Sequence, residues 1–387
     1  NTEGDYNTAV GVNALEQNTT GNNNTAIGRN TLDANTTGHS NTAVGTNSSG
    51  VNTTGANNVS MGLDSLKSNT TGEKNTAIGR SALDQNTTAD DNTAVGYNTL
   101  AANTTGTRNV GIAGLALDAN TTGNQNIAIG WQALTSNTTA SYNIAIGNNN
   151  LELNTTGEKN VAIGDGVLNV NTASNNTGIG HRALVVNTSG ASNTAVGALA
   201  LDANSTGDDN VAIGTYALSA NTTASDNTAV GYHALLANTT GAENVSVGYK
   251  SLDANTTGTN NTAVGVYALT ENTTASSNSA FGKNALYSNT TGGENSAFGL
   301  ASLSQNTTGI NNTGFGYGSL SATTTSSYNT SVGSHSLQDN TTGARNTAVG
   351  YKALADNTTG SYNVAVGDLA LELHTTGSHN IAIGKSA

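Results

Sequence analysis

Residues 7–23 read Asn7-Thr-Ala-Val-Gly-Val-Asn-Ala-Leu-Glu-Gln-Asn-Thr-Thr-Gly-Asn-Asn23, and the pattern begins again at Asn24. We number the positions of this unit from 0, the first Asn, to 16. Unit starts follow every 17 residues from 7 to 160 and from 176 to 380, with one step of 16 between them. The chain therefore holds 23 starts and 22 complete units. A fixed period over the whole chain is the signature of a repeat architecture rather than of disorder.

Each position of the unit keeps one chemical type. Position 0 is Asn in all 23 units, position 2 is always Ala, Ser or Gly, and position 3 is always apolar. Position 4 is Gly except at Ala113, and position 8 is Leu except at Ser49. Position 11 is Asn except at Thr323 and His374. Such columns predict that equivalent residues of successive units lie on top of one another.

The unit predicts one coil of a parallel β-solenoid, so we expect an all-β fold of about 22 stacked coils over residues 1–387. Seventeen residues are too few for a helix pair, and dense Asn, Thr and Gly disfavour helix. Positions 0 to 3 predict a short strand, positions 7 and 8 a second face, and positions 11 to 13 a third. Gly at position 4 and the small residue at position 14 are expected at corners with positive φ.

The core is predicted from the Leu column at position 8 and the Val/Ile column at position 3. One coil buries too little to fold alone, so stability must come from stacking. Phe281, Phe298 and Phe315 all fall at position 3 of consecutive coils, which predicts a stack of three rings. The 16-residue unit loses its residue in the turn after Asn171, where the loss does not reverse the facing of a strand.

Two interpretations of the Asn at position 11 remain open. The first is a buried ladder of stacked amides, which we also expect at position 0. The second is N-glycosylation, because Asn-x-Ser/Thr is an acceptor triplet and is intact in 19 of 22 units. The candidate acceptors are Asn18, Asn35, Asn52, Asn69, Asn86, Asn103, Asn120, Asn137, Asn154, Asn187, Asn204, Asn221, Asn238, Asn255, Asn272, Asn289, Asn306, Asn340 and Asn357.

Aromatic residues after the corner Gly are candidates for surface recognition, because exposed aromatic rings are favoured binding anchors. The alternative is that they only shield the coil edge. The candidates at position 5 are Tyr97, Trp131, Tyr232, Tyr249, Tyr317 and Tyr351, and Tyr216 and Tyr267 at position 6 belong to the same exposed group.

Composition excludes several functions. Asn, Thr and Gly number 60, 63 and 47 of 387 residues, and the formal net charge is −13. The acidic balance argues against nucleic acid, which requires Lys and Arg. No apolar run approaches the roughly 20 residues of a membrane span. The six His lie in unrelated columns, and we find no catalytic or cofactor motif. We therefore expect no enzyme activity, no cofactor and no metal.

The segment Asn-Thr-Ala-Val/Ile-Gly resembles the repeats of trimeric autotransporter adhesin heads, and with Ala-Leu-x-x-Asn-Thr-Thr-Gly it resembles arrays in phage-like tail fibres. The resemblance implies a left-handed parallel β-roll, often trimeric, that serves in surface attachment. The repeats in adhesin heads are shorter than 17 residues.

Three functions remain as hypotheses. The first is a structural subunit of an extracellular or surface fibre that associates end to end or as a homotrimer and, under the glycosylation interpretation, carries glycans; both ends of the sequence stop within a coil. The second is an adhesin or tail-fibre shaft that binds a receptor or sugar. The third is an ice-binding protein with regular Thr arrays, although adjacent Thr residues in a strand would face opposite sides.

Overall fold

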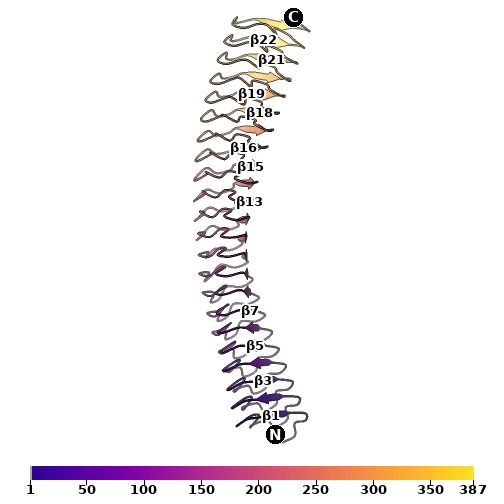
Figure 1. The fold of residues 1–387 in the computed structure, drawn as a ribbon, viewed down its shortest axis with the longest axis vertical. Coiled ribbons are helices and arrows are strands. Elements are labelled where there is room, and N and C mark those ends of the chain that lie inside the picture. The colour runs from indigo at the N-terminus through magenta and orange to yellow at the C-terminus, as the bar shows by residue number, and fades with distance from the viewer. Residues whose placement is uncertain (1) are drawn as a thin grey trace. The chain divides into compact units, whose positions relative to one another are not determined.

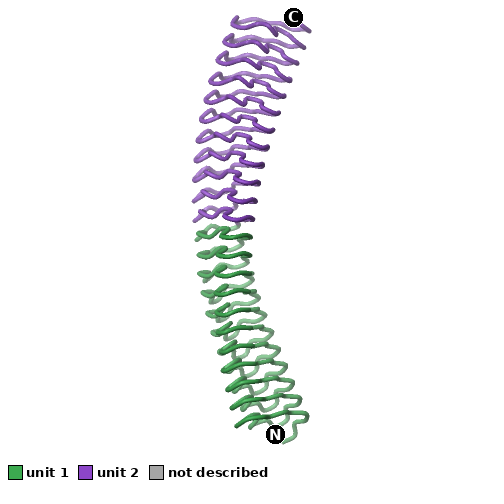
Figure 2. The backbone as a smooth tube through the Cα atoms, in the orientation of Figure 1, with its two compact units in different colours: residues 1–192 green, residues 193–387 purple. Residues whose placement is uncertain are grey.

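The computed structural model describes residues 2–387, and these form an all-β structure without helix (Figure 1). The chain divides into two compact units, residues 1–192 and 193–387 (Figure 2). Each repeat contributes one three-residue strand at positions 1 to 3. The strands of the first unit are β1 (Thr8–Val10), β2 (Thr25–Ile27), β3 (Thr42–Val44), β4 (Val59–Met61), β5 (Thr76–Ile78), β6 (Thr93–Val95), β7 (Val110–Ile112), β8 (Ile127–Ile129), β9 (Ile144–Ile146), β10 (Val161–Ile163) and β11 (Thr177–Ile179).

The second unit has the same coil. Its strands are β12 (Thr194–Val196), β13 (Val211–Ile213), β14 (Thr228–Val230), β15 (Val245–Val247), β16 (Thr262–Val264), β17 (Ser279–Phe281), β18 (Ser296–Phe298), β19 (Thr313–Phe315), β20 (Thr330–Val332), β21 (Thr347–Val349), β22 (Val364–Val366) and β23 (Ile381–Ile383).

Within each unit every strand pairs in parallel with the strand one repeat later. The pairing joins equal positions of the repeat, as in Ala26 with Ala43 in the first unit and Val230 with Val247 in the second. This confirms the predicted parallel β-solenoid with one repeat per coil. The second and third predicted faces are turns rather than strands, yet they too are joined from coil to coil, for example by the amide of Thr36 and the carbonyl of Thr53, at 2.9 Å.

The corners place unusual residues in the left-handed region. Gly at position 4 has positive φ as predicted, for example 138° at Gly28. Position 14 was predicted wrongly: it is small because a Cβ on Gly38 would meet the side-chain oxygen of Asn35 and the carbonyl of Gly55. Positions 6, 8 and 16 carry positive φ without being Gly, and Leu32 at position 8 has φ of 49°. Each such residue costs roughly 1–2 kcal/mol, which its burial or its coil-to-coil hydrogen bond must offset.

The core of each coil is narrower than predicted. Leu32 and its equivalents at position 8 are fully buried, as expected, and so are the small residues at positions 2 and 7, such as Ala26. The prediction for position 3 was wrong, because Ile27 is 41% exposed. Successive side chains of a strand point to opposite faces, so burying position 2 turns positions 1 and 3 outward.

The single 16-residue repeat keeps its strand in register. Val161 of β10 still pairs with Thr177 of β11, and Ile163 with Ile179. In this coil Ala173 takes the place of the residue at position 14, because its carbonyl accepts hydrogen bonds from the side chains of Asn160 and Asn171. The lost residue therefore lies in the turn after Asn171, as predicted.

Candidate functional site

The most extensive candidate surface is the outer strand face, which we define as the side chains at positions 1 and 3 of every strand. Position 1 carries Thr, Val, Ile or Ser. Position 3 carries Val10, Ile27, Val44, Met61, Ile78, Val95, Ile112, Ile129, Ile146, Ile163 and Ile179 in the first unit, and Val196, Ile213, Val230, Val247, Val264, Phe281, Phe298, Phe315, Val332, Val349, Val366 and Ile383 in the second.

The outer strand face is regular and uncharged; its position 3 column is apolar, and its position 1 column mixes Thr and Ser with Val and Ile. No Asp, Glu, Lys or Arg occurs at position 1, 2 or 3 of any strand, although the net charge of the chain is −13. Away from the terminal coils, the exposed fraction of the side chain at position 3 reaches 42% at Met61 and 55% at Phe315. A continuous exposed apolar surface is rare in soluble monomers and typically marks an interaction site.

Three rings interrupt the aliphatic column on this face. Phe281 stacks on Phe298 with ring centroids 4.9 Å apart and ring planes inclined by 6°. The ring centroids of Phe298 and Phe315 are 5.6 Å apart. This confirms the predicted stack, but it lies on the outer surface rather than in the core. Beside the first two rings, position 1 is Ser279 and Ser296, where the other 21 strands carry the larger Thr, Val or Ile.

The Asn at position 11 forms a buried ladder. The Nδ2 of Asn35 donates to the Oδ1 of Asn18 one coil earlier, at 2.8 Å, and to the carbonyl of Gly38 in its own coil, at 2.9 Å. The Asn at position 0 is buried in the same way: Asn24 donates through Nδ2 to the carbonyl of Gly38, and its Oδ1 accepts from the amide of Asn41. Each coil thus uses one carbonyl to hold two Asn side chains.

This ladder favours the structural interpretation of the Asn at position 11 over glycosylation of the folded chain. All the candidate acceptors are 0–1% exposed, and their Nδ2 atoms, which would carry the sugar, point into the coil. The buried acceptor residues are Asn18, Asn35, Asn52, Asn69, Asn86, Asn103, Asn120, Asn137, Asn154, Asn187, Asn204, Asn221, Asn238, Asn255, Asn272, Asn289, Asn306, Asn340 and Asn357. The triplet is a consequence of the ladder, because Thr also suits the following positions.

The ladder breaks where position 11 is not Asn. The Oδ1 of Asn306 is buried without a hydrogen-bond partner, since the next coil presents Thr323. The Oδ1 of Asn357 is in the same situation before His374. Both oxygens lack the Nδ2 donor that an Asn at position 11 of the next coil would supply. Leaving a buried acceptor unpaired lowers the free energy of unfolding by roughly 1–3 kcal/mol.

The six candidates at position 5 are exposed, and the structure brings only two of these six into direct contact with each other. Tyr97, Trp131, Tyr232, Tyr249, Tyr317 and Tyr351 are 42–51% exposed. Tyr232 and Tyr249 stack with centroids 5.5 Å apart. Three of the other four lie beside a cation or another ring: the guanidinium of Arg80 lies over Tyr97, Lys352 lies over Tyr351, and His335 packs edge-on against Tyr317.

Tyr232 and Tyr249 belong to a larger group in the second unit, which we call the aromatic cluster. It consists of Tyr216, Tyr232, His233, Tyr249, Tyr267 and Tyr287, whose neighbouring rings have centroids 3.9–6.2 Å apart. A surface hollow of about 520 Å³ beside it is lined by Tyr216, Ser219, Tyr232, His233 and Leu236. Sequence reasoning missed two members, His233 at position 6 and Tyr287 at position 9, because their contacts with Tyr216 and Tyr267 form only when successive coils stack.

His233 of the aromatic cluster lies beside the partly buried carboxyl group of Asp253. Nδ1 of His233 is 3.9 Å from Oδ1 of Asp253, an oxygen that has no hydrogen-bond partner. Burial raises the pKa of Asp253 above its ordinary value, although Lys250 and His233 lower it. Burial also raises the pKa of the Tyr267 phenol, and a hydrogen bond with Tyr249 raises it further. The Tyr267 phenol is therefore held in its neutral form.

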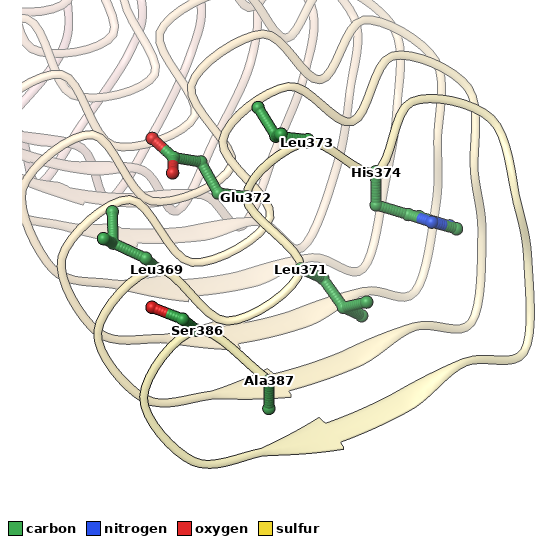
Figure 3. Close-up of a pocket in the computed structure, with 7 residues that line it drawn as sticks. All are labelled: Leu369, Leu371, Glu372, Leu373, His374, Ser386 and Ala387. Atoms are coloured by element: carbon green, nitrogen blue, oxygen red, sulfur yellow. The ribbon is translucent and has the colours of Figure 1, made fainter.

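A second hollow, of about 420 Å³, is the interior of the last coil seen from its end. Its lining includes Leu371 and His374, which stand at positions 8 and 11 and have no following coil in this chain to cover them (Figure 3). In residues 2–387 no three His, Asp or Glu side chains lie close enough to hold a metal ion. Nor does that part of the chain form a helix long and apolar enough to cross a membrane.

Comparison with known proteins adds no assignment. No family model matches the chain, and no curated protein matches it with significance. The outer strand face and the aromatic cluster are therefore the features that bear on function.

Proposed function

We propose that this chain forms the shaft of an extracellular or surface fibre, in which copies pack side by side through the outer strand face. The observation that carries the proposal is the uncharged apolar column at position 3, in which no residue is buried and residues such as Met61 and Ile213 are about 40% exposed. In the second unit alone, 12 consecutive strands contribute to this face, and a standard interface buries ~800 Å² per partner.

A second copy of the chain fits this face better than an unrelated partner does. Its strands repeat at the same ~4.8 Å spacing, so the side chains of each coil in one copy meet those of an equivalent coil in the other copy. The negative charges lie outside positions 1 to 3 and so stay in solvent when two such faces meet. The resemblance to trimeric adhesin heads supports the same kind of association, with three copies around one axis.

Sedimentation velocity on the native chain tests the proposal. We expect a defined multimer, and we expect Val230→Lys with Val247→Lys to shift it to monomer, because each Lys would meet its like in the other copy. The matched control is Val266→Lys with Leu300→Lys, two exposed aliphatic residues at position 5. A native chain that stays monomeric at micromolar concentration, or a control that dissociates equally, would contradict the proposal.

Sugar recognition is a second candidate function, favoured by the aromatic cluster and its hollow. The volume of about 520 Å³ lies within the range of small-molecule sites, and the lining mixes phenols, an imidazole and the hydroxyl of Ser219. Binding to an array of neutral oligosaccharides tests it. We expect Tyr232→Ala with Tyr249→Ala to abolish binding and Tyr97→Ala to preserve it; binding that is absent from the native chain would exclude this candidate.

Ice binding has less support from the structure. The Thr pair at positions 12 and 13 supplies no flat array, because Thr36 at position 12 is half-buried and donates its hydroxyl to the carbonyl of Thr53, at 3.1 Å. Thr37 at position 13 alone faces solvent. The outer strand face mixes Thr with Val and Ile and is interrupted by the three Phe rings. A thermal-hysteresis assay tests this alternative directly.

A further inference from the structure

We infer that Phe281, Phe298 and Phe315 set the axial register between associated copies, so that copies lie parallel with each ring stack against its counterpart. This inference rests on the proposed self-association through the outer strand face. A regular face poses a problem of specificity, because sliding one copy by a single coil returns nearly the same set of contacts. Repetitive surfaces of this kind specify register only weakly.

The three rings are the one strong irregularity on this face. They are the only Phe residues in the chain, and they occupy three consecutive coils of the position 3 column. Phe315 is 55% exposed, against 37% for Val332 in the next coil. A slipped copy would place these larger side chains opposite Val or Ile and leave gaps beside them, so only one register brings all the rings together.

The neighbouring position shows a matching change. Position 1 is Ser only at Ser279 and Ser296, the coils of Phe281 and Phe298. Both positions lie on the outer strand face, so the smaller Ser leaves room beside each ring for a ring from another copy. Neither change serves the interior, since Ala280 and Ala297 at position 2 are fully buried, as in most other coils.

The direction of association follows from the same residues. Cyclic symmetry about an axis parallel to the stack of coils brings each residue to the level of its counterpart in the other copies. Stacked or edge-to-face rings contribute about 0.5–1.5 kcal/mol per pair beyond their buried area. Three such levels favour the correct register over its neighbours, while the aliphatic column provides most of the affinity. The device is comparable to a single register-setting residue in a coiled coil.

The chain has no Cys, so introduced thiols report the register without interference. We would prepare Val230→Cys and Val264→Cys, which lie two coils, or about 10 Å, apart on the same face. The two proteins carry different isotopic masses and are mixed, dissociated, reassembled and exposed to a mild oxidant. A disulfide requires Cα atoms within about 7 Å, so links between unlike sites report a slipped register.

In the native background we expect disulfides between like sites, with unlike links at least tenfold rarer. In the background Phe281→Val, Phe298→Val, Phe315→Val we expect the multimer to persist and unlike links to rise to a comparable yield. The matched control is Tyr317→Val with Tyr351→Val, which removes two exposed rings outside the face and should leave the links unchanged. Circular dichroism confirms folding of each variant, since the replaced rings lie outside the core.

Three outcomes would overturn the inference. Frequent unlike links in the native background would show that no register is set. An unchanged pattern in the triple Phe variant would show that other residues set it. Loss of the multimer in that variant would show that the rings supply affinity rather than register. A native chain that does not associate at all contradicts the proposed function itself, and sedimentation of the unoxidised native chain separates that failure from the others.

Discussion

Ala26 is fully buried inside its coil, while its neighbour Ile27 is 41% exposed on the opposite face of the same strand. The interior at this level must accommodate the Leu column, so only Ala, Ser or Gly fits at position 2. The large aliphatic side chain consequently faces outward in every coil. Every coil therefore presents an apolar side chain to its surroundings, and a partner that covers this column would remove apolar surface from water.

The inside and outside of the strand can be distinguished by two adjacent substitutions in the second unit. We expect Ala229→Val to destabilise the fold by about 1–3 kcal/mol, because the added methyl groups overpack a closed interior. Val230→Ala should change the stability of the dissociated monomer by less than about 0.5 kcal/mol, because it removes surface atoms. Urea unfolding of dilute samples gives both values, and equal losses at the two sites would contradict the assignment of faces.

Repair of the Asn ladder is expected to stabilise the chain. Thr323→Asn places an amide where it can donate to the orphaned Oδ1 of Asn306, and we expect a gain of about 1 kcal/mol in the free energy of unfolding. Thr324→Asn, one residue later and outside the ladder, serves as the control and should bring no gain. A stability curve for Thr323→Asn that coincides with that of the native chain would argue that the unpaired oxygen carries no cost.

The folded chain is expected to be free of N-linked sugar, because every acceptor Nδ2 is buried in the ladder. After expression in a glycosylating cell, the soluble and folded fraction should have the mass of the bare sequence, 38.6 kDa. Intact-mass spectrometry of that fraction is the measurement. A folded protein with a glycan on Asn238, which is fully buried, would be incompatible with the ladder.

Asp253→Asn should stabilise the fold more at pH 7 than at pH 4. Burial raises the folded-state pKa of this carboxyl, so the folded chain holds the proton more tightly than the unfolded chain does. That contribution is present below the unfolded pKa and is lost as pH rises through the folded value, so the ionised carboxylate is unfavourable at neutral pH. Thermal melts at both pH values test this, with the exposed Asp209→Asn as control. A gain independent of pH would contradict it.

The sequence predicted the architecture because the coil repeats in every column. The buried Leu column followed from constancy alone. The Asn ladder at position 11 was one of two interpretations that the sequence left open, because the same residues form a glycosylation acceptor triplet. The Val/Ile column was misplaced because an apolar residue suggests burial, whereas strand alternation ties its facing to position 2. Constant small residues at positions 2 and 7 were the available signal that the interior is tight.

Other features could not be read from the sequence. Leu32 and Arg182 adopt positive φ, which neither residue type favours, because closure of the coil and hydrogen bonds to neighbouring coils impose it. The aromatic cluster joins positions 5, 6 and 9, and most of its ring contacts form between successive coils, where the sequence alone does not show which rings meet. His233, for instance, stacks on Tyr232 and meets the edge of Tyr216 from the coil before.

The most direct test of the proposed fibre is the oxidation rate of Met61, the only Met in the chain, which lies on the outer strand face and is 42% exposed in a single chain. Dilute hydrogen peroxide converts an accessible Met to its sulfoxide, and mass spectrometry follows the conversion. If a second copy covers the face, Met61 in the assembled protein should oxidise at least tenfold more slowly than a free Met peptide, and dissociation by dilution should restore the rate. Oxidation of Met61 at the peptide's rate in a concentrated native sample would show that the face is open to solvent and would contradict the account.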